Sequence, residues 1–151
     1  VVEDNASASI FIPAVLFAAA VFLSFSTGTS WGTFAILVPI ATSMFTGSAN
    51  MQMMIISVSA VLAGAVCGDH VSPISDTTVM SSAGAQSNHI NHVSTQMQYA
   101  AVVAVICFFG YILAGLVHIW WVVLGVSLIV LLGVLTAMKI ILGKRQEKGD
   151  A

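Results

Sequence analysis

Apolar runs separated by short polar interruptions make up most of the chain. Residues 10–25, 34–45 and 51–67 would form helices of about 18–25 Å, shorter than a bilayer core of about 30 Å. Residues 99–117 and 120–142 are long enough to cross that core. The pattern therefore predicts an all-α fold, that of a polytopic helical membrane protein, with its membrane domain over residues 10–142.

The first polar interruption, residues 26–33, has the sequence STGTSWGT. Two interpretations are open: a re-entrant helical hairpin over residues 10–45 with its tip at this interruption, or a single span broken there. Both apolar limbs are short, and non-helical backbone at membrane depth is tolerated only where it is buried in protein or lines a cavity. We therefore favour the hairpin and expect Gly28 and Gly32 to break the helix.

The second interruption, GDHVSPISDTT, follows the apolar run 51–67. One interpretation is a broken helix over residues 51–86: Gly68 and Pro73 stop its first half, and Ser75 or Asp76 caps its second half. The other is one long cytoplasmic loop over residues 68–98. Loops longer than about 12–15 residues are uncommon in compact domains, which favours the broken helix. The polar residues 86–98 are predicted to be a loop in either case.

Composition excludes a soluble domain, because 58% of the residues are hydrophobic, 7% are charged and the mean hydropathy is +1.02. The basic residues all lie near the C-terminal end: Lys139, Lys144, Arg145 and Lys148. Cytoplasmic segments beside membrane spans are rich in Lys and Arg, so the tail 143–151 is predicted to be cytoplasmic. Residues 118–121 then lie outside and residues 86–98 inside, and residues 1–9 form an extracellular or linker lead-in.

Asp69 and Asp76 are the only charged side chains between residues 5 and 138. A carboxylate at the bilayer centre costs about 2.5–3.5 kcal/mol on insertion scales, and no Lys or Arg of this span can neutralise either one. Each carboxylate therefore needs a bound cation, a proton or water. A helix break at Gly68 and Pro73 would also free backbone carbonyls, which can coordinate Na⁺.

Hydroxyl groups surround both interruptions and would complete a site between two broken elements, near the bilayer midplane. The candidate oxygen ligands beside the carboxylates are Ser72, Ser75 and Thr77, and those of the first interruption are Ser26, Thr27, Thr29 and Ser30. The alternative is that these hydroxyls bond back to helix carbonyls. Likewise, Asp76 could be an ordinary helix cap and Asp69 a solvated turn residue.

The two carboxylates are expected to differ in role. The positive end of the second half-helix would favour the ionised form of Asp76, whereas Asp69, placed deeper, is the better candidate to take a proton. His70 is a candidate proton relay, although a histidine satisfied within the break is an equal alternative.

Other features give little sign of further chemistry. His89 and His92 have helical spacing but are only a weak metal motif, and Cys67 and Cys107 are expected to be packed free thiols. The sequence holds no Gly-rich phosphate loop, Cys/His cluster or nucleophile elbow. We therefore expect no enzyme, no cofactor, no metal beyond Na⁺ as the transported ion, and no nucleic-acid partner.

At GDHVSPISDTTVMSS (residues 68–82), with STGTSWGT upstream, the chain resembles the NhaC family of bacterial Na⁺/H⁺ antiporters, within the ion-transporter superfamily. The resemblance covers residues 10–117. It implies an inverted-repeat transporter in which each repeat has a re-entrant hairpin and a broken helix, with this chain as the C-terminal repeat. It also implies that Asp69 and Asp76 are the cation and proton carboxylates and that the hydroxyls named above line the site.

The resemblance implies Na⁺/H⁺ exchange across the bacterial inner membrane by a multi-pass protein with a cytoplasmic C-terminus. The expected partners are the lipid bilayer, Na⁺, H⁺, the absent N-terminal repeat and, as one option, a second copy in a homodimer. One alternative is a Na⁺-coupled organic-anion antiporter, such as a malate/lactate exchanger. The other is a truncated, non-transporting membrane fragment, since the chain starts without a methionine or a signal peptide.

Overall fold

The computed structural model describes residues 9–45 and 51–149, and the side chains of this part up to residue 140. Every regular element described there is a helix. The helices are α2 (Ile12–Thr27), α3 (Ser30–Met44), α4 (Met51–Val71), α5 (Asp76–Gly84), α6 (His89–Val117) and α7 (Trp120–Gly149). The all-α prediction is confirmed for this part of the chain.

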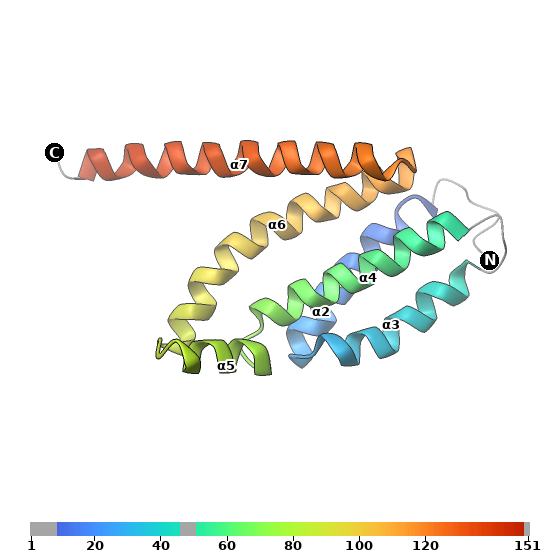
Figure 1. Cartoon of the computed structure of the whole chain (residues 1–151), viewed down its shortest axis with the longest axis horizontal. Coiled ribbons are helices and arrows are strands. Elements are labelled where there is room, and N and C mark those ends of the chain that lie inside the picture. Colours follow the sequence, from blue (N-terminus) through green and yellow to red (C-terminus); the bar gives the residue numbers. More distant parts are fainter. Residues whose placement is uncertain (1–8, 46–50, 150–151) are drawn as a thin grey trace.

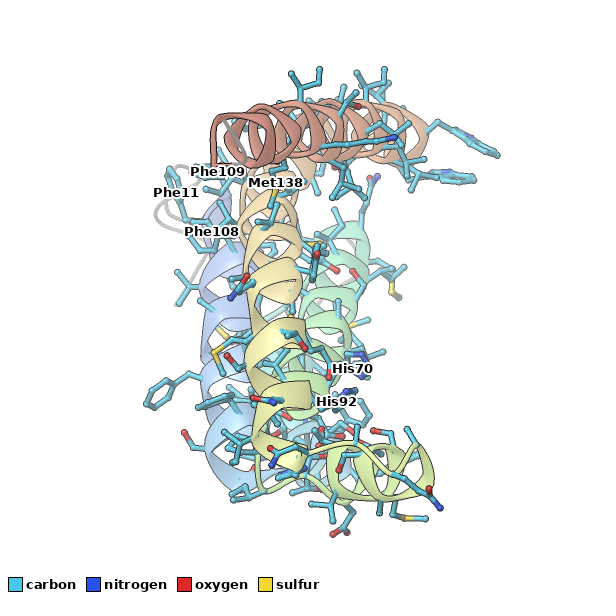
Figure 2. The ribbon with its side chains drawn as sticks, turned by 90° about the vertical axis from the view of Figure 1, so that its left-hand side faces the viewer. Phe11, His70, His92, Phe108, Phe109 and Met138 are labelled. Carbon is cyan, nitrogen blue, oxygen red and sulfur yellow. The ribbon has the colours of Figure 1, made fainter. Side chains whose placement is uncertain are left out.

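A helical hairpin and the helix that follows it form the best-packed part of the molecule. Helices α2 and α3 fold back on each other, α4 runs beside α2, and the short α5 lies across the end of this group (Figure 1). Helix α6 then returns along α2 and α4, and α7 packs chiefly on α6. Figure 2 shows α7 running across the upper ends of the other helices.

Small residues on α4 allow the close approach of α2. A Cβ at Gly64 would collide with the carbonyl oxygen of Phe17, and one at Gly68 would collide with that of Val21. Ala60, one turn before Gly64, is fully buried on the same face. Such small residues at four-residue spacing are typical of packed membrane helices, where backbones approach closely.

Two of the boundaries predicted after residue 51 are wrong. Gly68 does not break α4, which continues to Val71, because its missing side chain is used for packing against α2. The predicted loop over residues 86–98 is largely helical, since α6 begins at His89. The side chain of Asn88 caps this helix by accepting a hydrogen bond from the amide of Asn91 at 3.1 Å.

The polar start of α6 is explained by its length. Its 29 residues span about 43 Å, more than the 30 Å or so of a bilayer core. The polar first turns can therefore extend into water while the apolar remainder lies in lipid. A polar run therefore does not by itself indicate a loop, because the part of a helix that lies outside the membrane has no need of an apolar face toward lipid.

Within residues 9–45 and 51–149, three helices are long and apolar enough to cross a membrane: Met51–Val71, His89–Val117 and Trp120–Ile140. Large apolar side chains cover their outer faces and those of α2 and α3, with Trp31 80% and Phe22 74% exposed. Such a surface suits contact with lipid or further protein rather than water. The chain is therefore a helical membrane protein. Helices α2 and α3, of 16 and 15 residues, are shorter, and their re-entrant course stays a prediction.

The two ends of the helical bundle differ in what they contain. At one end, the side-chain amide of Gln52 on α4 donates to the carbonyl of His118, between α6 and α7, at 2.5 Å. A cavity of about 650 Å³ also opens at this end, lined mainly by apolar side chains of α4, α6 and α7. The hairpin turn, α5 and the start of α6 lie at the opposite end (Figure 1). The cavity is therefore remote from both polar interruptions.

Candidate cation site

The turn between α2 and α3 is shorter than the predicted interruption. Only Gly28 and Thr29 lie outside the two helices. Gly28 adopts the left-handed conformation, with φ of 66°, and its amide donates to the carbonyl of Ser24 at 2.8 Å. Thr29 is extended and caps α3 by accepting the Gly32 amide at 3.3 Å. Gly28 is therefore a break, whereas Gly32 is not, because it lies in the first turn of α3.

The second interruption falls between α4 and α5 and comprises residues 72–75. Pro73 lies within it, where its missing amide donor does not disturb a helix. Two turn-like backbone bonds shape the segment, from the Ser72 amide to Asp69 and from the Ser75 amide to Ser72. Helix α5 then begins at Asp76. Its N-cap residue is Ser75, one of the two caps that the sequence predicted, although the Ser75 side chain makes no capping bond.

The two breaks are in direct contact. A Cβ at Gly28 would lie 2.9 Å from the carbonyl oxygen of Ile74, so only glycine allows the turn to approach this backbone. The hydroxyl of Ser72 donates to the carbonyl of Phe25 at 2.7 Å. The structure therefore brings together two interruptions that lie far apart in sequence, since the Ser72–Phe25 bond joins residues 47 positions apart.

The two carboxylates have different surroundings. Asp69 is half-buried in the last turns of α4, and among the described residues its Oδ1 atom is buried without a hydrogen-bond partner. Asp76 is exposed in the first turn of α5, where the helix dipole favours a negative charge. A buried carboxylate oxygen that lacks a partner is costly unless a proton, cation or water meets it. Of the two carboxylates, Asp69 is therefore the one whose buried oxygen atom requires a proton, a cation or water as a partner.

The hydroxyls divide into two groups. Ser26 and Thr27 donate to the carbonyls of Phe22 and Leu23 within α2, at 2.8 and 2.9 Å, as the alternative interpretation predicted. Ser75 and Thr77 instead bond to each other at 2.8 Å, and Ser75 is 1% exposed. A hydroxyl that donates its hydrogen keeps lone pairs for a cation, so these bonds do not remove any of the four as a ligand.

The remaining candidates lie at the edges of the two breaks. Ser30 begins α3, directly after the extended Thr29. His70 is exposed near the end of α4, and its carbonyl accepts the Thr78 hydroxyl at 3.2 Å, which ties α4 to α5. Figure 2 shows the imidazoles of His70 and His92 toward the end of the molecule that carries α5.

Sequence reasoning missed the buried hydroxyls that hold the two breaks in place. Ser24 is fully buried and donates to the carbonyl of Ala65 on α4 at 2.6 Å. Thr33, 1% exposed, donates to the carbonyl of Thr29. Ser82 of α5, 3% exposed, contacts His89 of α6. Ser24 lies in an apolar run and Ser82 in a run of small residues, where a hydroxyl was the only signal, whereas Thr33 ends the first predicted interruption but was not named as a candidate.

The histidine pair of α6 contacts serines. Nδ1 of His89 lies 3.0 Å from the Ser82 hydroxyl, and Nε2 of His92 lies 3.4 Å from that of Ser81. In the described part of the chain, no group of three or more His, Cys, Asp or Glu side chains is placed to hold a metal ion. The two histidines therefore serve as contacts between α5 and α6 in this structure.

The apolar helices and the two touching polar breaks define a polytopic helical membrane protein with a candidate ion site. A family model described as the Na⁺/H⁺ antiporter family matches residues 1–116, which include both breaks and nearly all of α6. The chain belongs to the Na⁺/H⁺ antiporter family. The description of this family is that of antiporters, which are transport proteins.

A relative was found in Haemophilus influenzae, described as an uncharacterized protein. It is 53% identical to this chain over 108 residues, which cover 72% of this chain and 21% of that protein. The chain therefore matches about a fifth of the length of this curated relative. No solved structure matches the chain.

Proposed function

We propose that this chain provides part of a secondary active transporter that exchanges Na⁺ for H⁺ across the bacterial inner membrane. The observation that carries the proposal is the buried Oδ1 atom of Asp69, which has no hydrogen-bond partner among the described residues and lies one turn before a helix break that contacts a second break. No Lys or Arg occurs between residues 5 and 138. A cation or a proton is therefore the natural partner of this carboxylate.

The exchange follows from competition for the same oxygen atoms. Na⁺ binds while Asp69 is ionised, and a proton that neutralises the carboxylate removes the charge that holds Na⁺. Asp76, at the positive end of α5, supplies a second carboxylate. Further ligands are drawn from the hydroxyls of the two breaks: Ser72, Ser75, Thr77, Ser26, Thr27, Thr29 and Ser30. Proton entry down its gradient then drives Na⁺ out.

The proposal includes a place for the chain in a longer protein. We assign it to the NhaC type and to its C-terminal repeat, with an N-terminal repeat that supplies the other half of the site. The match to about a fifth of the Haemophilus influenzae protein supports a larger whole. The basic residues 139–148 support a cytoplasmic C-terminus.

An organic-anion antiporter is the less favoured function. A carboxylate substrate calls for a cationic side chain, and α2 to α6 contain no Lys or Arg. A non-transporting fragment is the other alternative. Reconstitution of the 151-residue chain alone does not separate it from our proposal, because both expect no Na⁺-dependent proton movement without the N-terminal repeat, so the test is made on the complete protein.

The test is a pair of isosteric substitutions in the complete protein. Asp69→Asn and Asp76→Asn remove a negative charge while keeping the side-chain shape, and each is expected to reduce the Na⁺-driven pH change in everted vesicles to background. Ser43→Ala is the control, because its exposed hydroxyl donates to the carbonyl of Ile40 within the same helix, near the far end of α3. Wild-type exchange in both aspartate variants would overturn the mechanism.

A further inference from the structure

His89 links the start of α6 to the second break. Its Nε2 atom lies 2.7 Å from the carbonyl oxygen of Pro73, and its Nδ1 atom lies 3.0 Å from the hydroxyl of Ser82 on α5. The imidazole is half-buried. One side chain therefore joins three parts of the chain: the break, α5 and α6.

The chemistry of these partners fixes which nitrogen carries the proton. A carbonyl oxygen only accepts hydrogen bonds, so Nε2 of His89 must be the donor to Pro73. In the neutral ring Nδ1 is then an acceptor. The hydroxyl of Ser82, 3% exposed, lies 3.0 Å from Nδ1 and 2.9 Å from the carbonyl oxygen of Val79, and its single hydrogen can be donated to either of these acceptors. The contact to Pro73 therefore selects one tautomer and one orientation of the ring.

The Pro73 carbonyl is a sensitive point of the candidate site. It lies between Ser72, whose hydroxyl holds the hairpin through Phe25, and Ile74, whose carbonyl meets Gly28. A backbone segment outside any helix has no regular hydrogen bonds to hold its carbonyls, so their directions depend on such individual contacts. Fixing Pro73 therefore also fixes the neighbouring groups that face the first break.

We propose that His89 is a positioning residue for the exchange. Its Nε2–H group holds the Pro73 carbonyl, which keeps residues 72–75 in the geometry that binds Na⁺. This inference rests on the proposed function, since it concerns the geometry of the same site. His89 itself does not touch the transported ion.

Two amide substitutions separate the contacts of the ring. The amide nitrogen of Gln reaches the position of Nε2, so His89→Gln can keep the donor to Pro73. Asn is shorter and reaches only the position of Nδ1, so His89→Asn loses that donor. His92→Gln and His92→Asn are the matched controls, because His92 lies one turn further along α6 and contacts Ser81 of α5 instead of the break.

Two measurements are made on the complete protein. The first is the KM for Na⁺ and the maximal rate of exchange in everted vesicles. Loss of one hydrogen bond at the break predicts that His89→Asn raises the KM about threefold to tenfold, with a smaller effect on the maximal rate. The second is hydrogen–deuterium exchange of the peptide covering residues 72–79, which is expected to become faster in His89→Asn. His89→Gln and both His92 variants should resemble the wild type in both measurements.

Either of two results would overturn the proposal: His89→Asn behaves as wild type in both measurements, or His89→Gln and His89→Asn are impaired equally. If the wild type shows no Na⁺-driven exchange, the proposed function fails, and the deuterium-exchange contrast between Asn and Gln alone decides the role of His89. If His89→Asn does not fold, Ser82→Ala replaces it. Removing the partner of Nδ1 frees the ring. If the rate of hydrogen–deuterium exchange at residues 72–79 in Ser82→Ala then equals that of the wild type, the proposal is refuted.

Discussion

Two fully buried serines, Ser24 on α2 and Ser57 on α4, differ in their hydrogen-bond partners. The hydroxyl of Ser24 donates to Ala65 across the helix pair, whereas among the described residues that of Ser57 has no partner. A buried hydroxyl without a partner costs about 1–3 kcal/mol, while a typical satisfied one contributes about 0.5–1.5 kcal/mol. The same substitution should therefore have opposite effects at the two positions.

We expect Ser24→Ala to lower the free energy of unfolding by about 0.5–1.5 kcal/mol and Ser57→Ala to leave it unchanged or raise it. Thermal unfolding of the detergent-solubilised protein measures both. The two variants control each other, because each removes one buried oxygen atom from a tightly packed helix. A larger loss of stability in Ser57→Ala than in Ser24→Ala would contradict the assignment of their partners.

At the same scale, the sequence predicted hydrogen bonds within one helix better than hydrogen bonds between separate helices. Back-bonding of Ser26 and Thr27 could be foreseen, because the partner lies four residues earlier on the same helix. The contacts of Ser24 and His89 could not, since their partners are 41 and 16 residues away and depend on how separate helices pack. The roles of Asp69 and Asp76 in binding stay predictions.

At the scale of the helices, only some of the glycine and proline residues predicted to break a helix do so. Gly28 and Pro73 do lie in breaks, but Gly68 and Gly32 lie within helices. A single sequence cannot tell a glycine that ends a helix from one that lets a neighbouring helix approach, because both uses depend on the same missing side chain. Gly68 is of the second kind, because the backbone of α2 packs against it.

Gly68→Ala tests this packing role. The added Cβ would collide with the carbonyl of Val21 and lie 2.8 Å from the amide nitrogen of Phe25, so α2 and α4 must move apart. Overpacking of this kind costs about 1–3 kcal/mol, and we expect a lower midpoint of thermal unfolding in detergent. The atoms in the way belong to the backbone of α2, which cannot move aside as easily as the end of a flexible side chain.

The matched control is Gly84→Ala at the end of α5, where an added Cβ would meet nothing within 4 Å. Alanine also has the better helix propensity, so this variant should be neutral or slightly more stable. Equal destabilisation by the two substitutions would refute a specific role of Gly68 in packing. A stabilised Gly68→Ala would show that α2 and α4 are less closely packed than they are here.

For the whole molecule, the exposed apolar surface matters most. No residue in the span Trp120–Ile140 of α7 is buried, and the stacked Trp120 and Trp121 are 61% and 66% exposed. Apolar periodicity could predict that these residues form a helix. It could not predict where α7 lies, because little of α7 is fixed by contacts with α2 to α4. Its surface is left for lipid or for further protein.

The topology predicted from the basic tail gives a test of the whole arrangement. The turn between α6 and α7 and the turn between α5 and α6 are separated by the 29 residues of α6, about 43 Å of helix, so they should lie on opposite sides of the membrane. Ile119→Cys and Ser87→Cys place a thiol in each exposed turn, in a background with Cys67→Ser and Cys107→Ser. A membrane-impermeant maleimide should label Ser87→Cys in everted vesicles and Ile119→Cys in intact cells.

Both thiols should react after detergent solubilisation, which controls for their intrinsic reactivity. Labelling of both from one side would refute the crossing of the membrane by α6, whereas exchanged sides would keep the crossing and reverse the predicted cytoplasmic C-terminus. The expected result also fixes the side of the candidate site, because Ser87 follows α5, which begins directly after the second break. Ions would then reach the breaks from the cytoplasmic side in this conformation. The proposed export of Na⁺ against H⁺ entry would require the same site to open to the other side later in the cycle.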